Sequence, residues 1–146
     1  MDLILWRHAE AEEGAPDLER SLTAKGERQA KKMAEFLRPR LPHSTRILVS
    51  PARRTQQTAQ ALTRDFITAP SIAPGASAAA VLESAAWPDA GGCTLIVGHQ
   101  PALGEAAARI MAGGRGSWSI RKGAVWWMVQ RDHETALRLI ISPDLL

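Results

Sequence analysis

The sequence has a single cysteine, Cys93, no tyrosine and only two phenylalanines among its 146 residues. One cysteine excludes an intramolecular disulfide, so we expect a reducing, cytoplasmic location. Long apolar runs are also absent. The longest one near the N-terminus, Leu3–Trp6, is far shorter than the roughly 20 residues of a membrane span, and it is too short for the apolar core of a signal peptide. The sequence therefore predicts neither a disulfide framework nor a membrane partner.

The composition is typical of one globular domain, and we expect a single domain over residues 1–146. Hydrophobic residues make up 45% of the chain and charged residues 23%, the balance of a folded protein with one core. The net charge is only +3, and basic residues occur as scattered pairs such as Lys31-Lys32 and Arg53-Arg54. Nucleic-acid binders concentrate their positive charge, so this pattern predicts a mild preference for anions and no nucleic-acid partner.

Strand-like and helix-like segments alternate along the chain. Three apolar runs have the length of buried strands: Asp2–Arg7, Ile47–Ser50 and Thr94–Gly98. Helical patterns follow them, from the Thr23 cap to the stop at Pro39, from Ser50-Pro51 to about Leu62, and from Pro101 to Gly113-Gly114. This alternation predicts a three-layer α/β/α sandwich with a mostly parallel sheet.

The C-terminal part predicts an antiparallel hairpin. Two strand-like runs, Ala124–Gln130 and Ala136–Ile141, flank a polar turn at Arg131–Thr135, so the sheet should be mixed. Trp126 and Trp127 are consecutive in the first run and must point to opposite faces, so at most one of them can lie on the surface.

Histidines and arginines follow all three predicted parallel strands. The first strand runs into Arg7-His8, the second into Ser50-Pro51 and Arg54, and the third into Gly98-His99. Ligands of open α/β sheets bind at the carboxyl ends of such strands, so these side chains should converge. Arginines and helix N-termini bind phosphate, a neutral histidine can attack phosphorus, and a protonated one can stabilise a phosphoryl oxygen. The sequence therefore predicts a phosphoryl-group site.

Four segments resemble motifs of the histidine phosphatase superfamily, in the same order. They are Arg7-His8-Ala9, Leu22–Gly26 with Gln29-Ala30, Ser50–Ala59 and Gly98–Pro101. The resemblance implies that His8 forms a phosphohistidine intermediate without a metal or other cofactor. It also implies that Arg7, Arg54 and His99 hold the phosphoryl oxygens, with Arg54 rather than Arg53 in that role, and that Arg20 adds a contact. Ala9 stands where most members have glycine, and its methyl group could tighten the pocket.

The chain resembles the SixA-type phosphohistidine phosphatases in particular. Only a brief stretch separates Thr58 from Gly98, which leaves no room for the cap insertion of larger members. This resemblance implies a phosphohistidine substrate on a signalling phosphotransfer domain. A small-molecule phosphomonoesterase and a catalytically silent phosphate-binding module remain as alternatives.

The sequence does not decide which residue acts as the general acid. Glu83 is the nearest match to the glutamate of other branches, Glu10 is a second candidate, and an exposed glutamate on an Ala-rich helix is the simpler interpretation of Glu83. Cys93 does not predict a cysteine phosphatase, since position 99 holds a histidine where that chemistry needs an arginine. His43 and His133 fall in predicted loops, and no histidine has metal-ligand spacing.

Overall fold

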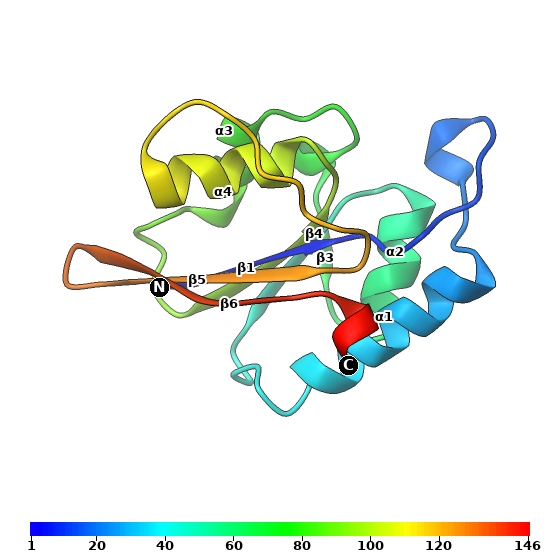
Figure 1. Cartoon of the computed structure of the whole chain (residues 1–146), viewed down its shortest axis with the longest axis horizontal. Helices are drawn as coiled ribbons and strands as arrows, with labels where there is room; N and C mark the ends of the chain where they lie inside the picture. Colours follow the sequence, from blue (N-terminus) through cyan, green and yellow to red (C-terminus); the bar gives the residue numbers. More distant parts are fainter.

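A computed structural model describes all residues from Met1 to Leu146 and contains one mixed sheet of six strands with four helices around it (Figure 1). The strands are β1 (Asp2–Arg7), β2 (Arg46–Val49), β3 (Ile67–Thr68), β4 (Cys93–Gly98), β5 (Val125–Arg131) and β6 (Glu134–Ile141). The helices are α1 (Ala24–Leu37), α2 (Arg53–Gln60), α3 (Ala78–Ala85) and α4 (Ala102–Ala112). Three short 3-10 turns complete it: η1 (Asp17–Glu19), η2 (Pro70–Ile72) and η3 (Pro143–Leu145). None of the helices has the length and apolar character that a membrane span needs.

The sheet has the strand order β3-β2-β4-β1-β5-β6. The strands β3, β2, β4 and β1 are parallel, and the hairpin of β5 and β6 joins β1 in antiparallel orientation. The predicted α/β sandwich with a mixed sheet and a C-terminal hairpin is confirmed. The pairing of β1 with β4 ends at Arg7 opposite Gly98, which brings the residues after these two strands side by side.

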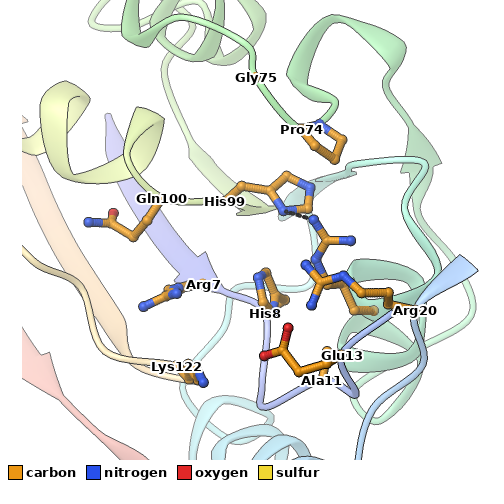
Figure 2. Close-up of a pocket in the computed structure, with 11 residues that line it drawn as sticks. Arg7, His8, Ala11, Glu13, Arg20, Pro74, Gly75, His99, Gln100 and Lys122 are labelled. Carbon is orange, nitrogen blue, oxygen red and sulfur yellow. Dashed lines mark hydrogen bonds between the residues drawn. The ribbon is translucent and has the colours of Figure 1, made fainter. Parts of the chain in front are cut away.

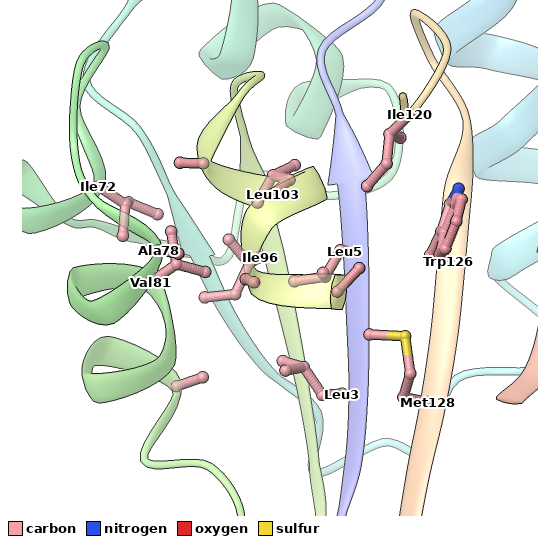
Figure 3. Packing of buried hydrophobic residues seen from close by; sticks show 14 of the residues in the cluster. Leu3, Leu5, Ile72, Ala78, Val81, Ile96, Leu103, Ile120, Trp126 and Met128 are labelled. Carbon is pink, nitrogen blue, oxygen red and sulfur yellow. The ribbon is translucent and has the colours of Figure 1, made fainter. Parts of the chain in front are cut away.

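Helices cover both faces of the sheet, which explains why the early strands are apolar without alternation. On one face α3 and α4 pack on Leu3, Leu5 and Ile96, together with Trp126 (Figure 3). On the other face α1 and α2 pack on residues such as Ile4 and Trp6. The two adjacent tryptophans of β5 therefore belong to opposite cores, and both Trp126 and Trp127 are buried.

Local signals set several helix ends as expected. The Thr23 hydroxyl accepts a hydrogen bond of 2.9 Å from the Gly26 amide and so caps α1. Gly113, with φ of +63°, ends α4 in the left-handed conformation that glycine adopts without strain. The hairpin turn is shorter than predicted, because Asp132 and His133 both adopt positive φ and let the ladder continue to its last pair.

Candidate active site

A pocket of about 300 Å³ opens at the carboxyl ends of β1, β2 and β4. Residues from five separate segments line it: Arg7, His8, Ala11, Glu13, Arg20, Arg54, Pro74, Gly75, His99, Gln100 and Lys122 (Figure 2). The structure thus brings together five of the seven residues that the sequence singled out for this site. Glu83 and Glu10 are the exceptions.

His8 is held so that one ring nitrogen faces the pocket with a free lone pair. Its Nδ1 lies 2.7 Å from the Ala9 carbonyl oxygen. Because a carbonyl only accepts, Nδ1 carries the proton and Nε2 is left unprotonated. Burial, followed by the charges of Arg54 and Arg7, lowers the pKa of His8 to about 4. The ring therefore stays neutral at pH 7, the state that a nucleophile requires.

His99 is fixed through its two ring nitrogens. Its Nε2 lies 2.7 Å from the Ser50 hydroxyl, and its Nδ1 lies 3.4 Å from Nη2 of Arg54. A guanidinium only donates, so Nδ1 accepts and Nε2 donates to Ser50. Burial, followed by the charges of His8 and Arg54, lowers the pKa of His99 to about 3. A bound phosphoryl dianion would raise this pKa and turn Nδ1 into a donor.

Arg7 and Arg54 each keep one buried N–H group without a partner. Arg7 donates from Nη1 to the Ile120 carbonyl at 2.8 Å, and Arg54 donates from Nη1 to the Asp17 carbonyl at 2.9 Å. The Nε atoms of these two arginines are the buried side-chain nitrogen or oxygen atoms that lack a hydrogen bond. An unmet buried donor is costly, and both arginines line the pocket, where their positive charge favours an anion.

The neighbouring arginines differ in their surroundings. Arg53 is exposed on α2 and lies outside the pocket, whereas Arg54 is 4% exposed and lines it. Arg20 reaches the pocket from residues 10–22, where its Nε lies 3.1 Å from the Asp17 carboxylate and its Nη1 donates to the Glu12 carbonyl at 3.1 Å.

The two glutamates suggested as general acid do not line the pocket. Glu83 is exposed on α3, since the buried face of that helix is made by Ala78, Val81 and Ala85. Glu10 accepts a hydrogen bond of 2.8 Å from the Thr23 hydroxyl and so supports the start of α1. The carboxylate that lines the pocket belongs to Glu13, which points toward His8 (Figure 2). The structure therefore does not bring Glu83 or Glu10 to the pocket.

Other residues noted in the sequence lie away from the pocket. Ala9 does not tighten it, because its side chain is buried against Leu22 and Ala30. Cys93 is buried at the start of β4, at the far end of the strand from the pocket. His43 and His133 are exposed.

Several motif residues that carry no charge position the site, and sequence reasoning missed their roles. Gln29 Oε1 accepts from the Glu10 amide at 2.9 Å, and Gln57 Oε1 accepts from the Leu22 amide at 2.7 Å, so both ends of residues 10–22 are fixed. A β-carbon at Gly26 would lie 1.9 Å from the Glu10 carbonyl oxygen, which explains the glycine. The sequence signal for these roles was that Gln29, Gln57 and Gly26 all lie within the motif segments.

A family model described as the histidine phosphatase superfamily (branch 1) matches residues 3–75, half of the chain. The chain belongs to the histidine phosphatase superfamily. A curated relative, an uncharacterized protein of Picosynechococcus sp., is 34% identical over 170 aligned positions that cover all of this chain and 99% of the relative.

Solved histidine phosphatase structures share the whole fold. The protein histidine phosphatase SixA in complex with tungstate superposes with a TM-score of 0.84 at 22% identity, over 99% of both chains. The protein assigned as SixA of Agrobacterium tumefaciens gives 0.79 at 26% identity, over 97% of both chains. A phosphoserine phosphatase of Entamoeba histolytica gives 0.74 at 16% identity, over 99% of this chain and 98% of that one. Superfamily phosphatases with different substrates therefore have this fold.

The depressed pKa values of His8 and His99 predict an acid-sensitive fold. Both histidines are neutral in the native state, with pKa values of about 4 and about 3. In the unfolded chain they titrate near pH 6.5. As the pH falls below about 6.5, these two histidines therefore become protonated in the unfolded chain but remain neutral in the native state. The contribution of the two histidines to the free energy of unfolding should be fully present above this pH. The free energy of unfolding should then fall by roughly 2–4 kcal/mol from pH 7 to pH 5.

Urea denaturation at several pH values, in buffers without phosphate, measures this dependence. A His99→Gln variant removes one of the two titrating groups, so its curve should be about half as steep between pH 7 and pH 5. Parallel curves for the variant and the wild type would contradict the burial of His99 in its neutral form.

Proposed function

We propose that this superfamily phosphatase removes the phosphoryl group from a phosphohistidine side chain of a signalling phosphotransfer protein, through a phosphohistidine intermediate on His8 and without a metal. The observation that carries the proposal is the convergence of Arg7, Arg54 and His99 on one pocket with His8, whose Nδ1 is engaged by the Ala9 carbonyl so that Nε2 keeps its lone pair. Tungstate, a phosphate-like anion, is bound in the SixA structure with the same fold.

In the first step Nε2 of His8 attacks phosphorus in line. The bond between phosphorus and the substrate imidazole breaks, its electron pair stays on the leaving nitrogen, and that nitrogen takes up a proton from solvent. Arg7 and Arg54 bind the phosphoryl oxygens, and His99 donates to one of them once its proton is in place. These guanidinium groups supply the positive charge that stabilises the transferring group.

In the second step a water molecule attacks the phosphorus of phospho-His8 and releases one proton to solvent as phosphate forms. The bond between phosphorus and Nε2 breaks, and the electron pair returns to the His8 ring, which is then ready for another turnover. The hydrogen bond from Nδ1 to the Ala9 carbonyl holds the ring in one tautomer through both steps. Inorganic phosphate leaves the pocket.

The shape of the pocket supports a substrate presented on a protein. Of the long segment between Gln60 and Cys93, only Pro74 and Gly75 contribute to the pocket wall, so no inserted element covers the entrance. A side chain projecting from a partner protein can therefore reach Nε2 of His8. An imidazole, with a pKa near 6.5, is also a much easier leaving group than an alkoxide.

Turnover of a phosphorylated phosphotransfer domain, compared with phosphoserine and with a panel of sugar and nucleotide phosphates, tests the substrate class. We expect kcat/KM for the phosphoprotein to exceed that of each small ester by at least about 100-fold, because the imidazole leaves readily and the entrance is open. Faster turnover of a small ester would contradict the proposal and identify a phosphomonoesterase.

Substitution of Glu13 tests the alternative that the protein is a small-molecule phosphomonoesterase. An alkoxide leaving group needs a proton, and Glu13 is the carboxylate that points into the pocket. Glu13→Gln should reduce turnover of phosphoserine by about 100-fold and that of the phosphoprotein by less than about 5-fold. Glu83→Gln is the matched control, since Glu83 is exposed outside the pocket. An equal loss in both glutamine variants would contradict a role for Glu13.

A further inference from the structure

We propose that Asp17 is a positioning residue that holds Arg54 and Arg20 in place for the phosphoryl group. The inference rests on the proposed function, because it concerns the same phosphate site. Asp17 does not line the pocket and was not among the predicted site residues. It lies in η1, within residues 10–22 that pass over the pocket edge. Its contacts nevertheless fix two of the pocket arginines.

Asp17 holds Arg54 with both its backbone and its side chain. The Asp17 carbonyl oxygen accepts from Nη1 of Arg54 at 2.9 Å, and its Oδ2 lies 3.2 Å from Nη2. These two contacts occupy the end of the guanidinium group. The Nε–H group of Arg54 is left buried and without a partner. Asp17 thus fixes the orientation of the Arg54 guanidinium group at the pocket wall through two of its nitrogens.

The same carboxylate also holds Arg20. Its Oδ1 lies 3.1 Å from Nε and 3.0 Å from Nη2 of Arg20, and Nη1 of Arg20 is held separately by the Glu12 carbonyl at 3.1 Å. One carboxylate therefore joins an arginine of α2 to an arginine of the 10–22 segment. Without it, these two like charges would repel each other at the wall of a pocket that Arg7 and Lys122 also line.

Asp17 can affect phosphate binding in two opposite ways, and magnitudes decide between them. As an anion it repels phosphate, but its side chain is 54% exposed, so water and salt screen this repulsion. As a hydrogen-bond acceptor it fixes the direction of a guanidinium whose side chain is only 5% exposed. Charge-assisted hydrogen bonds at a buried group outweigh a screened surface repulsion. Removing the Asp17 charge should therefore weaken phosphate binding, the opposite of the net-charge expectation.

Isothermal titration calorimetry with tungstate and with inorganic phosphate tests whether removing the Asp17 charge weakens or strengthens anion binding. Asp17→Asn should weaken binding of both anions about 10-fold, because the contacts with two arginines weaken. Glu19→Gln is the matched control: it removes the same charge from the same short turn, and Glu19 does not line the catalytic pocket. It should leave binding unchanged or slightly tighter. Asp17→Glu should recover more affinity than Asp17→Asn, because it restores a carboxylate.

Two further readouts separate positioning from general structural support. In turnover assays Asp17→Asn should raise KM with kcat within about 3-fold of wild type, since the reacting atoms are not touched. The effects of Asp17→Asn and Arg20→Ala should not add, because the two residues act through one contact. Anion binding by Asp17→Asn as tight as in Glu19→Gln, or tighter, would overturn the inference. A wild-type protein that binds neither anion would instead overturn the proposed phosphate site itself.

Discussion

A His8→Asn variant should lose turnover by at least about 10⁴-fold while it still binds tungstate within a few-fold of wild type. The reason is that the His8 ring is neutral and supplies a lone pair, whereas the charge that attracts the anion belongs to the arginines of the pocket. The variant should also fail to form a phosphoenzyme. The measurement is labelling with radioactive substrate during turnover, followed by stability of the label in acid and in base.

Wild-type protein should carry acid-labile, base-stable label on His8, and the variant should carry none. Calorimetry with tungstate is the control, because retained binding shows that the pocket of the variant is intact. Wild type that turns over substrate without trapping label on His8 would contradict covalent catalysis. Wild type that binds phosphate without turnover would support the alternative of a silent binding module.

Replacing Arg54 with alanine should lower kcat/KM by about 10³-fold, whereas Arg53→Ala should change it by less than about 3-fold. The two residues are adjacent in sequence, but Arg54 is buried in the pocket and Arg53 is exposed outside it. The expected loss reflects both the removal of a charge that binds the phosphoryl oxygens and the loss of a partner of His99. Steady-state kinetics of both variants, with the phosphoprotein as substrate, measures the difference.

Arg54→Lys refines this comparison, because it keeps the charge but loses the planar pair of donors. We expect it to recover only a small part of the activity lost in Arg54→Ala. Equal losses in Arg53→Ala and Arg54→Ala would mean that the register assigned to α2 is wrong. Unfolding midpoints of the variants show whether a loss of activity reflects a loss of fold.

Much of the fold could be predicted because the central strands β1 and β4 are buried on both faces. Residues 3–6 of β1 are fully buried, and a run of this kind is visible in the sequence without alternation. The convergence of Arg7, His8, Arg54 and His99 followed from the same argument, since parallel strands deliver their carboxyl ends to one edge. These residues directly follow strands or begin a helix, so their positions depend little on loop conformation.

The parts that escaped prediction lie in segments without periodicity. Strand β3 has only two residues, both exposed, and so leaves no apolar signal. Glu13 and Asp17 lie in a loop whose course is set by distant contacts, such as the Gln57 side chain with the Leu22 amide. Glu83 was suggested as the nearest match to the glutamate of other superfamily branches, and the packing of α3 through Ala78, Val81 and Ala85 directs that side chain to solvent.

The ladder between β1, β4 and β2 continues past the strand ends into the active site. The His8 amide donates to the Gly98 carbonyl, and the Ser50 amide donates to the Val97 carbonyl, both at 3.1 Å. Amide protons at these positions should exchange with solvent about as slowly as those of the sheet interior. His8 and Ser50 are thus tied by backbone hydrogen bonds to the central sheet, whereas Glu13, Pro74 and Lys122 sit on loops. Substrate range can therefore diversify through the loops while the phosphoryl-transfer geometry stays constant.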